Sequence, residues 1–371
     1  MKERKVKIVQ VVGARPNFMK VAPIQQAFSK CNEVEAFIVH TGQHKDVNMS
    51  DVFFRQLDLP QPKYFLGVQA GSHSYMTAQM MVAFEEVLLK EEPDLVVVVG
   101  DVTSTLACAL TSVRNKIPVA HVEAGLRSFD RDMPEEINRI LTDQISDYLF
   151  ITEESARKNL IRENIPGHKI FFTGNCMIDS LVKFLKPAQE LNMAKNWGLA
   201  QGKYALMTMH RPTNVDTGEG LSKIIQLLEW TVGQTPVVFP VHPRTESRLK
   251  EFGLWTRLES MQGLIPTAPL GYLEFISLLN GCKFILTDSG GIQEETSYLG
   301  IPCLTFRRTT ERPVTVEVGS NRMIEDLSIE SAILAIREIL HGSFRPGGIP
   351  ELWDGHAGQR IVDVILSRVL H

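Results

Sequence analysis

Short apolar runs rich in β-branched residues alternate with longer helical stretches along the whole chain. Continuous apolar strands joined by helices are typical of a parallel sheet covered on both faces. In the first half the predicted strands are 6–12, 36–40, 95–99, 119–122, 148–151 and 170–173, with helices such as 79–89 and 137–145 between them. In the second half strands are predicted at 204–209, 237–241, 264–266, 284–286 and 303–306.

The pattern restarts near residue 204, after a stretch rich in polar and helix-forming residues. A chain of 371 residues is also longer than one ordinary core requires. We therefore predict an α/β protein with two Rossmann-like doubly wound domains, 1–176 and 177–355, facing each other across a cleft. The tail after residue 356 has the apolar spacing of an amphipathic helix.

Composition narrows the class of protein. The net charge of −4, without any dense Lys/Arg block, gives no support for nucleic-acid binding. The five cysteines are scattered without a CxxC pair, and the sequence has no metal-ligand spacing, dinucleotide fingerprint or P-loop, so neither a metal nor a cofactor is expected. The N-terminal apolar run is too short for a signal peptide, and the longest run, 95–99, is far from a membrane span. We expect a cytoplasmic protein without membrane contact.

The segment 287–295, TDSGGIQEE, follows a predicted strand and leads into a helix that ends at Gly300. A Ser-Gly-Gly turn in this position leaves backbone N–H groups at the positive end of the helix dipole, and glycine lets a phosphate come close. Glu295, more than one turn further on, could accept hydrogen bonds from ribose hydroxyls. The segment favours a bound nucleoside diphosphate; the alternative is a plain strand–helix turn with a capping serine.

Acidic residues follow two strands of the first domain, at the sheet edge where open α/β sheets bind ligands. Asp101 follows 95–99, where it could also cap a helix, and Glu123 stands before a glycine-containing loop. Glu135 and Glu136 open the next helix, where acids stabilise the helix dipole, so only one of them need be catalytic.

Histidines and basic residues occupy other strand ends. His210 and His242 each end a strand of the second domain, which is unusual for residues that only pack. Arg15 and Lys20 follow the first strand, where they either meet a diphosphate or are ordinary surface charges. Arg312 lies in a basic loop that could close over a diphosphate.

Together these motifs resemble those of the non-hydrolysing UDP-N-acetylglucosamine 2-epimerase family. The resemblance runs through nearly the whole chain: GARPNFMK at 13–20, HTGQH at 40–44, GDVTST at 100–105, HVEAGLRS at 121–128, PEEINR at 134–139, MHRPTN at 209–214, PVHPR at 240–244, TDSGGIQEE at 287–295 and TTERP at 309–313. It implies the GT-B-like arrangement of many glycosyltransferases, with a UDP-sugar between the domains and a homodimer overall. It also implies that the C-terminal helix, 356–371, crosses back to complete the first domain.

The resemblance implies roles for individual residues. The family's catalytic group corresponds to Asp101, Glu123, Glu135 and His210. Its substrate contacts correspond to Arg15, Lys20, Arg139, His242, Ser289, Gly290, Gly291, Glu295 and Arg312. Phe275 is similar to the residue against which the uracil packs.

Some segments depart from the family pattern. The segment 68–74 is unlike the best-known bacterial members, and Asp46 replaces a longer side chain. Because that region forms a second, activating UDP-sugar site in some members, we do not predict activation here. Val314 and Thr315 stand where many members carry an acid. These differences flank the expected cleft, so the sugar could be a variant such as a diacetamido uronic acid or a deoxy sugar.

The chemistry explains why such residues are needed. The C2–H of a nucleotide sugar has no adjacent carbonyl, so inversion requires either oxidation by a nicotinamide or departure of the C1 substituent. Without a dinucleotide fingerprint the second route is favoured. As UDP leaves, a base can remove the C2 proton to give a 2-acetamidoglucal, and UDP then returns while a proton arrives from the other face. We predict interconversion of UDP-N-acetylglucosamine and UDP-N-acetylmannosamine for surface polysaccharide precursors.

Three other functions stay open. A hydrolysing 2-epimerase would let water trap the intermediate and release free UDP. A GT-B glycosyltransferase would need an acceptor and would not exchange the C2 hydrogen with solvent. A nucleotide-sugar sensor would bind the ligand unchanged, and it has no use for several acids and two histidines at strand ends.

Overall fold

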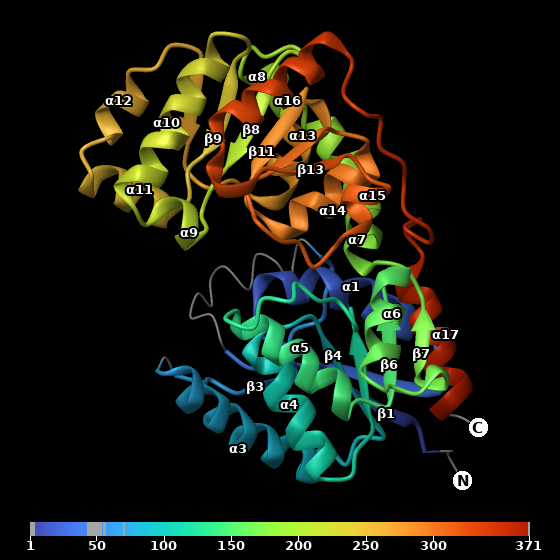
Figure 1. Ribbon diagram of the computed structural model, residues 1–371. Coiled ribbons are helices and arrows are strands. Elements are labelled where there is room, and N and C mark those ends of the chain that lie inside the picture. The colour runs from blue at the N-terminus through green and yellow to red at the C-terminus, as the bar shows by residue number, and fades with distance from the viewer. Residues whose placement is uncertain (1–3, 43–53, 55–56, 70, 370–371) are drawn as a thin grey trace. The chain divides into compact units, whose positions relative to one another are not determined.

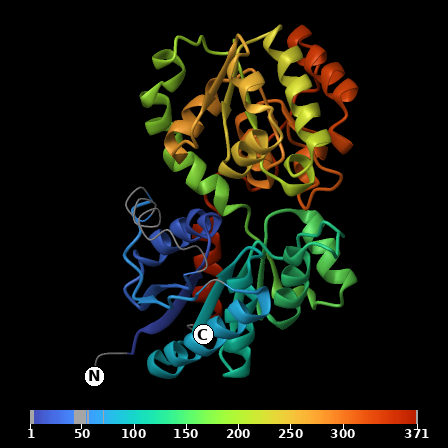
Figure 2. The same ribbon diagram turned by 90° about the vertical axis from the view of Figure 1, so that its left-hand side faces the viewer.

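The computed structural model describes residues 4–42, 54, 57–69 and 71–369 (Figure 1). The chain divides into two compact units: Met1–Ser180 with Glu351–His371, and Leu181–Pro350. In each unit helices cover both faces of one parallel sheet (Figures 1 and 2). The predicted class, α/β with two Rossmann-like units, is confirmed.

Among the described residues the first unit has a seven-stranded parallel sheet, in the order β3-β2-β1-β4-β5-β6-β7. Its strands are β1 Val6–Val12, β2 Val34–His40, β3 Tyr64–Phe65, β4 Leu95–Val99, β5 Val119–Val122, β6 Tyr148–Ile151 and β7 Ile170–Phe172. Its helices are α1 Arg15–Phe28, α3 His73–Glu91, α4 Thr103–Arg114, α5 Pro134–Ile145, α6 Glu154–Arg162 and α17 Ala357–Val369, with a 3-10 turn at Gly167–Lys169. Helix α7, Cys176–Leu191, leads into the second unit.

The second unit has a six-stranded parallel sheet in the order β10-β9-β8-β11-β12-β13. Its strands are β8 Ala205–Thr208, β9 Val237–Pro240, β10 Leu264–Thr267, β11 Phe284–Thr287, β12 Cys303–Thr305 and β13 Asn321–Met323. Its helices are α8 Met193–Asn196, α9 Pro212–Val215, α10 Gly218–Val232, α11 Pro243–Glu251, α12 Trp255–Glu259, α13 Tyr272–Gly281, α14 Gly290–Leu299, α15 Val314–Glu317 and α16 Ile329–His341, with a 3-10 turn at Glu325–Leu327.

The predicted strands are confirmed, with ends shifted by no more than about two residues, as is usual for element boundaries. Two strands were missed. Both lie at sheet edges, where β3 has two residues and β13 reads Asn-Arg-Met, so neither shows the apolar run of a strand buried on both faces. Helix α3 begins at His73, before the predicted residue 79, because Ser72 caps a polar first turn by accepting from the Tyr75 N–H at 3.2 Å.

The C-terminal helix α17 packs against α1 within the first unit (Figures 1 and 2). The Asp179 carboxylate caps it by accepting from the N–H groups of Ala357 at 3.0 Å and Gly358 at 2.7 Å. Gly358 permits the contact, since a Cβ there would lie 2.8 Å from Pro23 of α1. The preceding segment is held by the buried Trp353, whose indole N–H donates to the Thr152 carbonyl at 2.9 Å.

Each sheet reverses its strand order once, between β1 and β4 in the first unit and between β8 and β11 in the second. Loops leave the carboxyl ends of such neighbouring strands in opposite directions, which opens a crevice where ligands bind. Ligand contacts are therefore expected near these two reversals.

Candidate functional site

Two acids stand at the carboxyl ends of neighbouring strands in the first unit, Asp101 after β4 and Glu123 after β5. Glu123 has a φ of +73°, a left-handed conformation that side-chain-bearing residues seldom adopt. Such strain persists only where the surroundings hold it, and it is concentrated at functional sites. Glu123 is nevertheless buried, with 7% of its surface exposed.

Lys20 of α1 forms a buried ion pair with Glu123. Gly100 makes room for the pair, because a Cβ there would lie 3.0 Å from the Lys20 Nζ and 3.5 Å from the Glu123 Oε2. Lys20 was predicted to contact the diphosphate, but in this structure its ammonium group bonds the proposed catalytic carboxylate. A cation in this position fixes the orientation of the Glu123 carboxylate.

Asp101 is held by α5. The Arg139 guanidinium lies 2.9 Å from the Asp101 Oδ2, and the Asn138 side chain donates to the Asp101 carbonyl at 2.8 Å. Arg139 also pairs with Glu136. The structure thus joins the predicted catalytic Asp101 to the predicted substrate contact Arg139.

The structure distinguishes the two neighbouring glutamates of α5. Glu136 is buried, and its carboxylate accepts from the Ser128 N–H at 2.9 Å and the Phe129 N–H at 3.0 Å, so it shapes the loop before the helix. Glu135 is only partly buried at the start of the helix. Glu136 therefore has a structural role, and the catalytic role of Glu135 stays a prediction.

A buried polar network that no sequence motif predicted lies beneath these strand ends. The Asp143 carboxylate lies 2.7 Å from the His121 Nδ1 and 2.7 Å from the Arg127 guanidinium. The other ring nitrogen of His121 lies 2.8 Å from the Gly100 carbonyl oxygen. Burial alone would raise the pKa of Asp143, but the charges and hydrogen bonds of His121 and Arg127 outweigh it and lower that pKa. The network ties β5 to the loop that carries Asp101.

In the second unit the buried Asp288 bridges the two strands at the reversal of strand order. It follows β11, and its carboxylate accepts from the Arg211 N–H at 2.9 Å and lies 2.9 Å from the His210 Nδ1 after β8. Burial works to raise the pKa of Asp288, but the hydrogen bond and charge of His210 and the backbone N–H groups of His210 and Arg211 lower it. Asp288 was not among the predicted site residues, although it stands at a strand end.

His242 lies beside His210, with ring centroids 5.5 Å apart. It is the N-cap of α11, and its Nδ1 accepts from the Arg244 N–H at 3.2 Å. Burial, followed by the charges of His210 and Arg244, lowers the pKa of His242. The structure brings the two predicted histidines together.

The Ser-Gly-Gly turn leads directly into α14, with Ser289 at the N-cap and Gly300 in a left-handed C-cap, so the predicted strand–turn–helix is confirmed. Among the described residues the Ser289 side chain makes no capping hydrogen bond, which removes the plain capping interpretation. A Cβ at Gly291 would meet no described atom within 4 Å, so this first turn is open to a ligand.

Arg312 stands beside the same turn, but carboxylates surround it. Its guanidinium lies 2.6 Å from the Glu294 Oε1 and also pairs with Glu311. A Cβ at Gly290 would lie 2.9 Å from the Glu311 Oε1, so a side chain here would displace the carboxylate of the ion-pair cluster. The predicted contact between Arg312 and a diphosphate stays a prediction.

For the remaining predicted site residues, Glu295, Phe275 and Arg15, the structure gives a position and little more. Glu295 is buried on α14, and Phe275 is partly exposed on α13. Arg15 begins α1, but its side chain is outside the described part of the structure, as are Asp46 and most of the segment around it.

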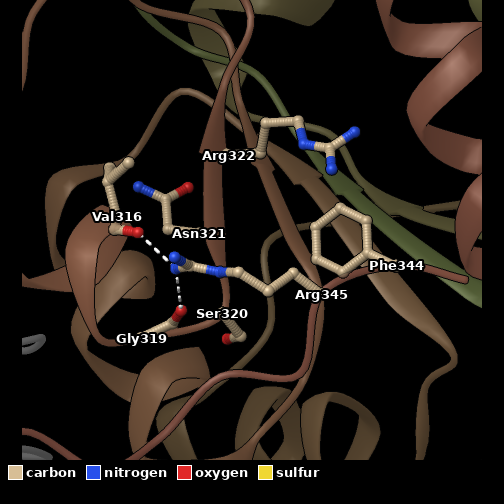
Figure 3. A pocket seen from close by; sticks show the side chains of 7 residues that line it. All are labelled: Val316, Gly319, Ser320, Asn321, Arg322, Phe344 and Arg345. Atoms are coloured by element: carbon tan, nitrogen blue, oxygen red, sulfur yellow. Dashed lines mark hydrogen bonds between the residues drawn. The ribbon is translucent and has the colours of Figure 1, made fainter.

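A hollow of about 240 Å³ lies elsewhere on the second unit (Figure 3). The Arg345 guanidinium points across it and donates to the carbonyl oxygens of Val316, of Glu317 at 3.2 Å and of Gly319 at 3.1 Å. Arg322 above it lies 2.8 Å from the Glu338 carboxylate and stacks on Phe344. Both cations therefore stabilise this part of the fold.

Within the part of the chain that the structure describes, none of the helices combines the length and apolar character that a membrane crossing requires. The same residues contain no group of three or more His, Cys, Asp or Glu side chains able to hold a metal ion.

Comparison with known proteins identifies the family of this chain. A model of the UDP-N-acetylglucosamine 2-epimerase family matches residues 26–366. The chain is 45% identical over 367 residues to the UDP-N-acetylglucosamine 2-epimerase of Methanocaldococcus jannaschii, covering 97% of this chain and 99% of the relative. It is 40% identical over 367 residues to the UDP-2,3-diacetamido-2,3-dideoxy-D-glucuronate 2-epimerase of Pseudomonas aeruginosa, with the same two coverages.

A solved structure agrees with the sequence matches. The crystal structure of the M. jannaschii enzyme in complex with UDP-GlcNAc and UDP superposes with a TM-score of 0.88 at 44% identity, covering 98% of this chain and all of that one. The matches place the chain in the class of α/β isomerases that act on nucleotide sugars. More narrowly, the chain belongs to the UDP-N-acetylglucosamine 2-epimerase family, the non-hydrolysing family that its motifs indicated.

Proposed function

We propose that this protein interconverts UDP-N-acetylglucosamine and UDP-N-acetylmannosamine. The single observation that carries the proposal is the 45% identity, over almost the full length of both chains, to an enzyme of that name. The local structure supports it, because Asp101 and Glu123 are held at neighbouring strand ends and the first turn of α14 is open to a phosphate.

The reaction proceeds by elimination and re-addition of UDP. When the C1–O bond breaks, its electron pair stays on the diphosphate, and the positive charge at C1 makes the C2 proton removable. A carboxylate takes that proton to give the 2-acetamidoglucal. UDP then adds back to C1 while a proton reaches C2 from the opposite face, so no external oxidant or cofactor is consumed.

The proposed roles follow the family's motifs. Asp101, Glu123 and Glu135 share the proton transfers, and His210 assists at the leaving diphosphate. The proposed substrate contacts are Arg15, Lys20, Arg139, His242, Ser289, Gly290, Gly291, Glu295 and Arg312, with Phe275 against the uracil. Because Lys20 bonds Glu123 and Arg139 bonds Asp101, we expect these two cations to orient the carboxylates as well.

Incubation with UDP-N-acetylglucosamine in D₂O, followed by NMR, tests the function. We expect gluco and manno forms of the UDP-sugar, both with deuterium at C2. Accumulation of free UDP and N-acetylmannosamine would instead identify a hydrolysing enzyme. Conversion only with an added acceptor, and with C2–H retained, would identify a glycosyltransferase.

A second candidate substrate is the UDP-diacetamido uronic acid of the P. aeruginosa relative, which is 40% identical to this chain. The same D₂O experiment with both UDP-sugars decides between them. A much larger kcat/KM for the diacetamido uronic acid would replace the first proposal without changing the reaction type.

Ser289→Ala should weaken UDP binding. A hydroxyl that donates to a charged oxygen contributes about 1.5–3 kcal/mol, which corresponds to a loss of affinity of about ten- to a hundredfold. Calorimetric titration with UDP measures the change. Ser297→Ala is the matched control, since the Ser297 hydroxyl lies deeper in α14 and donates to the Gln293 carbonyl at 2.7 Å. Equal affinities of the two variants for UDP would remove Ser289 from the site.

We also expect a homodimer, through the outer face of α3. Tyr75, Val82 and Leu89 recur every seven residues there and are 55%, 64% and 67% exposed. An apolar stripe with this spacing is typical of a helix that packs against another helix. The double variant Val82→Glu, Leu89→Glu should sediment as a monomer, whereas Leu334→Glu on α16 should behave as the wild type. A dimeric double variant would exclude α3 as the interface, and a monomeric wild type would exclude the homodimer.

The expected cellular role is the supply of a precursor for surface polysaccharide in the cytoplasm, where UDP-sugars are made. Deletion of the gene in its host, followed by sugar analysis of the envelope, tests it. An unchanged envelope composition would argue against this role while leaving the enzymatic proposal intact.

A further inference from the structure

The Asp288 carboxylate contacts both the ring and the backbone of His210. Its Oδ1 lies 2.9 Å from the His210 Nδ1. Its Oδ2 accepts from the Arg211 N–H at 2.9 Å and from the Asn214 side chain at 3.1 Å. The His210 N–H also points at this carboxylate, 3.1 Å and 3.0 Å from the two oxygens. An ionised carboxylate accepts hydrogen bonds and donates none, so Nδ1 must carry the proton, and Nε2 is the nitrogen turned away from Asp288.

The neighbouring His242 is held in the opposite way. A backbone N–H can only donate, and the Arg244 N–H donates to the His242 Nδ1 at 3.2 Å. That nitrogen must therefore keep its lone pair, and the proton sits on Nε2. Protonating Nδ1 would break the N-terminal cap of α11. The lowered pKa of His242, caused first by its burial and then by the charge of His210, agrees with a neutral ring.

We infer that Asp288 is a positioning residue which, together with the first turn of α11, holds His210 and His242 in opposite tautomers. The inference rests on the proposed function for its chemical meaning. His210 can gain a proton at Nε2 while Asp288 balances the charge, so it can follow the changing charge of a departing diphosphate. His242 offers a constant Nε2–H donor, because its other nitrogen is already occupied. The two rings, 5.5 Å apart, therefore have different tasks.

Asp288→Asn provides a sharp test because the direction of its effect is fixed by the neighbours. The N–H of Arg211 and the side-chain amide of Asn214 both donate to Oδ2, so the amide oxygen of the variant should take that position. Its NH₂ group then faces the His210 Nδ1 and donates to it. The proton of His210 must move to Nε2, the wrong nitrogen for the proposed role. Where a catalytic histidine is held in the wrong tautomer, turnover falls by about 10²–10⁴-fold.

The tautomers are read directly by two-bond ¹H–¹⁵N correlation of ¹⁵N-histidine-labelled protein at neutral pH, with His210→Gln and His242→Gln for assignment. We expect a protonated Nδ1 in His210 and an unprotonated Nδ1 in His242. In Asp288→Asn we expect His210 to lose the Nδ1 proton, and kcat to fall far more than the affinity for UDP. Thr208→Val is the control. The Thr208 hydroxyl bonds the Thr287 hydroxyl across the same two strands, and only the Thr208 backbone carbonyl, which the substitution keeps, accepts from the Asp288 N–H at 3.3 Å.

Wild-type spectra that show both rings as the same tautomer would overturn the inference, as would an Asp288→Asn variant whose His210 keeps its Nδ1 proton. If Asp288→Asn does not fold, the wild-type spectra alone decide. The spectra need no substrate, so they are independent of the proposed reaction. If the two histidines are opposite tautomers but the protein does not epimerise the UDP-sugar, the inference is supported and the proposed function is contradicted.

Discussion

Glu123→Gln should lower turnover by about 10²–10⁴-fold, the usual contribution of a general acid or base. The amide keeps the shape of the carboxylate but cannot take up a proton. It also leaves the Lys20 ammonium without its buried counter-charge, so some loss of stability is expected as well. Deuterium incorporation at C2 measures the proton transfer, and UDP titration checks that the variant binds UDP as the wild type does.

A matched control for this variant lies on the next strand of the same sheet. Glu153 is a buried glutamate just after β6, and its carboxylate accepts from the Ser155 hydroxyl at 2.5 Å. Glu153→Gln should leave the rate of C2 exchange largely unchanged. Equal rates for Glu123→Gln and the wild type would remove Glu123 from the proton-transfer scheme.

Asp143→Asn should destabilise the first unit by about 3–5 kcal/mol, the cost of breaking a buried ion pair. The substitution removes the negative charge between His121 and Arg127, both of which are buried. Urea unfolding followed by circular dichroism measures the loss. Glu154→Gln is the control, because Glu154 pairs with Arg157 on the exposed side of α6, and such pairs contribute at most about 1 kcal/mol.

The same variant should change how stability depends on pH. The folded-state pKa of Asp143 is lowered, so its contribution is present above the ordinary carboxyl range, about pH 4, and is lost as the pH falls through the lower folded value. In acid, therefore, the stability difference between wild type and Asp143→Asn should shrink. A difference that stays constant down to acid pH would show that Asp143 is not ionised in the folded protein.

The fold could be predicted from the sequence because a run of apolar residues indicates a buried strand without any information about the rest of the chain. Each central strand, such as β4 with its five consecutive apolar residues, is visible without knowledge of the rest of the chain. Edge strands cannot be recognised in this way. For example, β13 is paired on one side only and tolerates polar residues. Asp101, Glu123 and His210 could be selected for a related reason, since polar residues directly after buried strands are rarely there for packing.

The partners of those residues could not be predicted in the same way. Lys20 and Glu123 are separated by 103 positions, and no periodicity reports which charges meet after folding. Glu135 and Glu136 look equivalent in sequence, and only the loop amides bound by Glu136 separate them. Asp288 was not predicted because its neighbours Ser289 and Gly290 already explained the motif as a phosphate-binding turn. Its position directly after a strand did indicate a site residue.

The return of the last helix to the first unit has a consequence for biosynthesis. A ribosome releases α17 only after it has made all of Leu181–Pro350, so until then the face of α1 that α17 covers stays open. The second unit can complete its fold before the first. A stop codon after residue 350 would therefore leave the second unit, Leu181–Pro350, able to fold but would deprive the first unit of α17. In proteins whose domains simply follow one another along the chain, the same truncation damages the later domain.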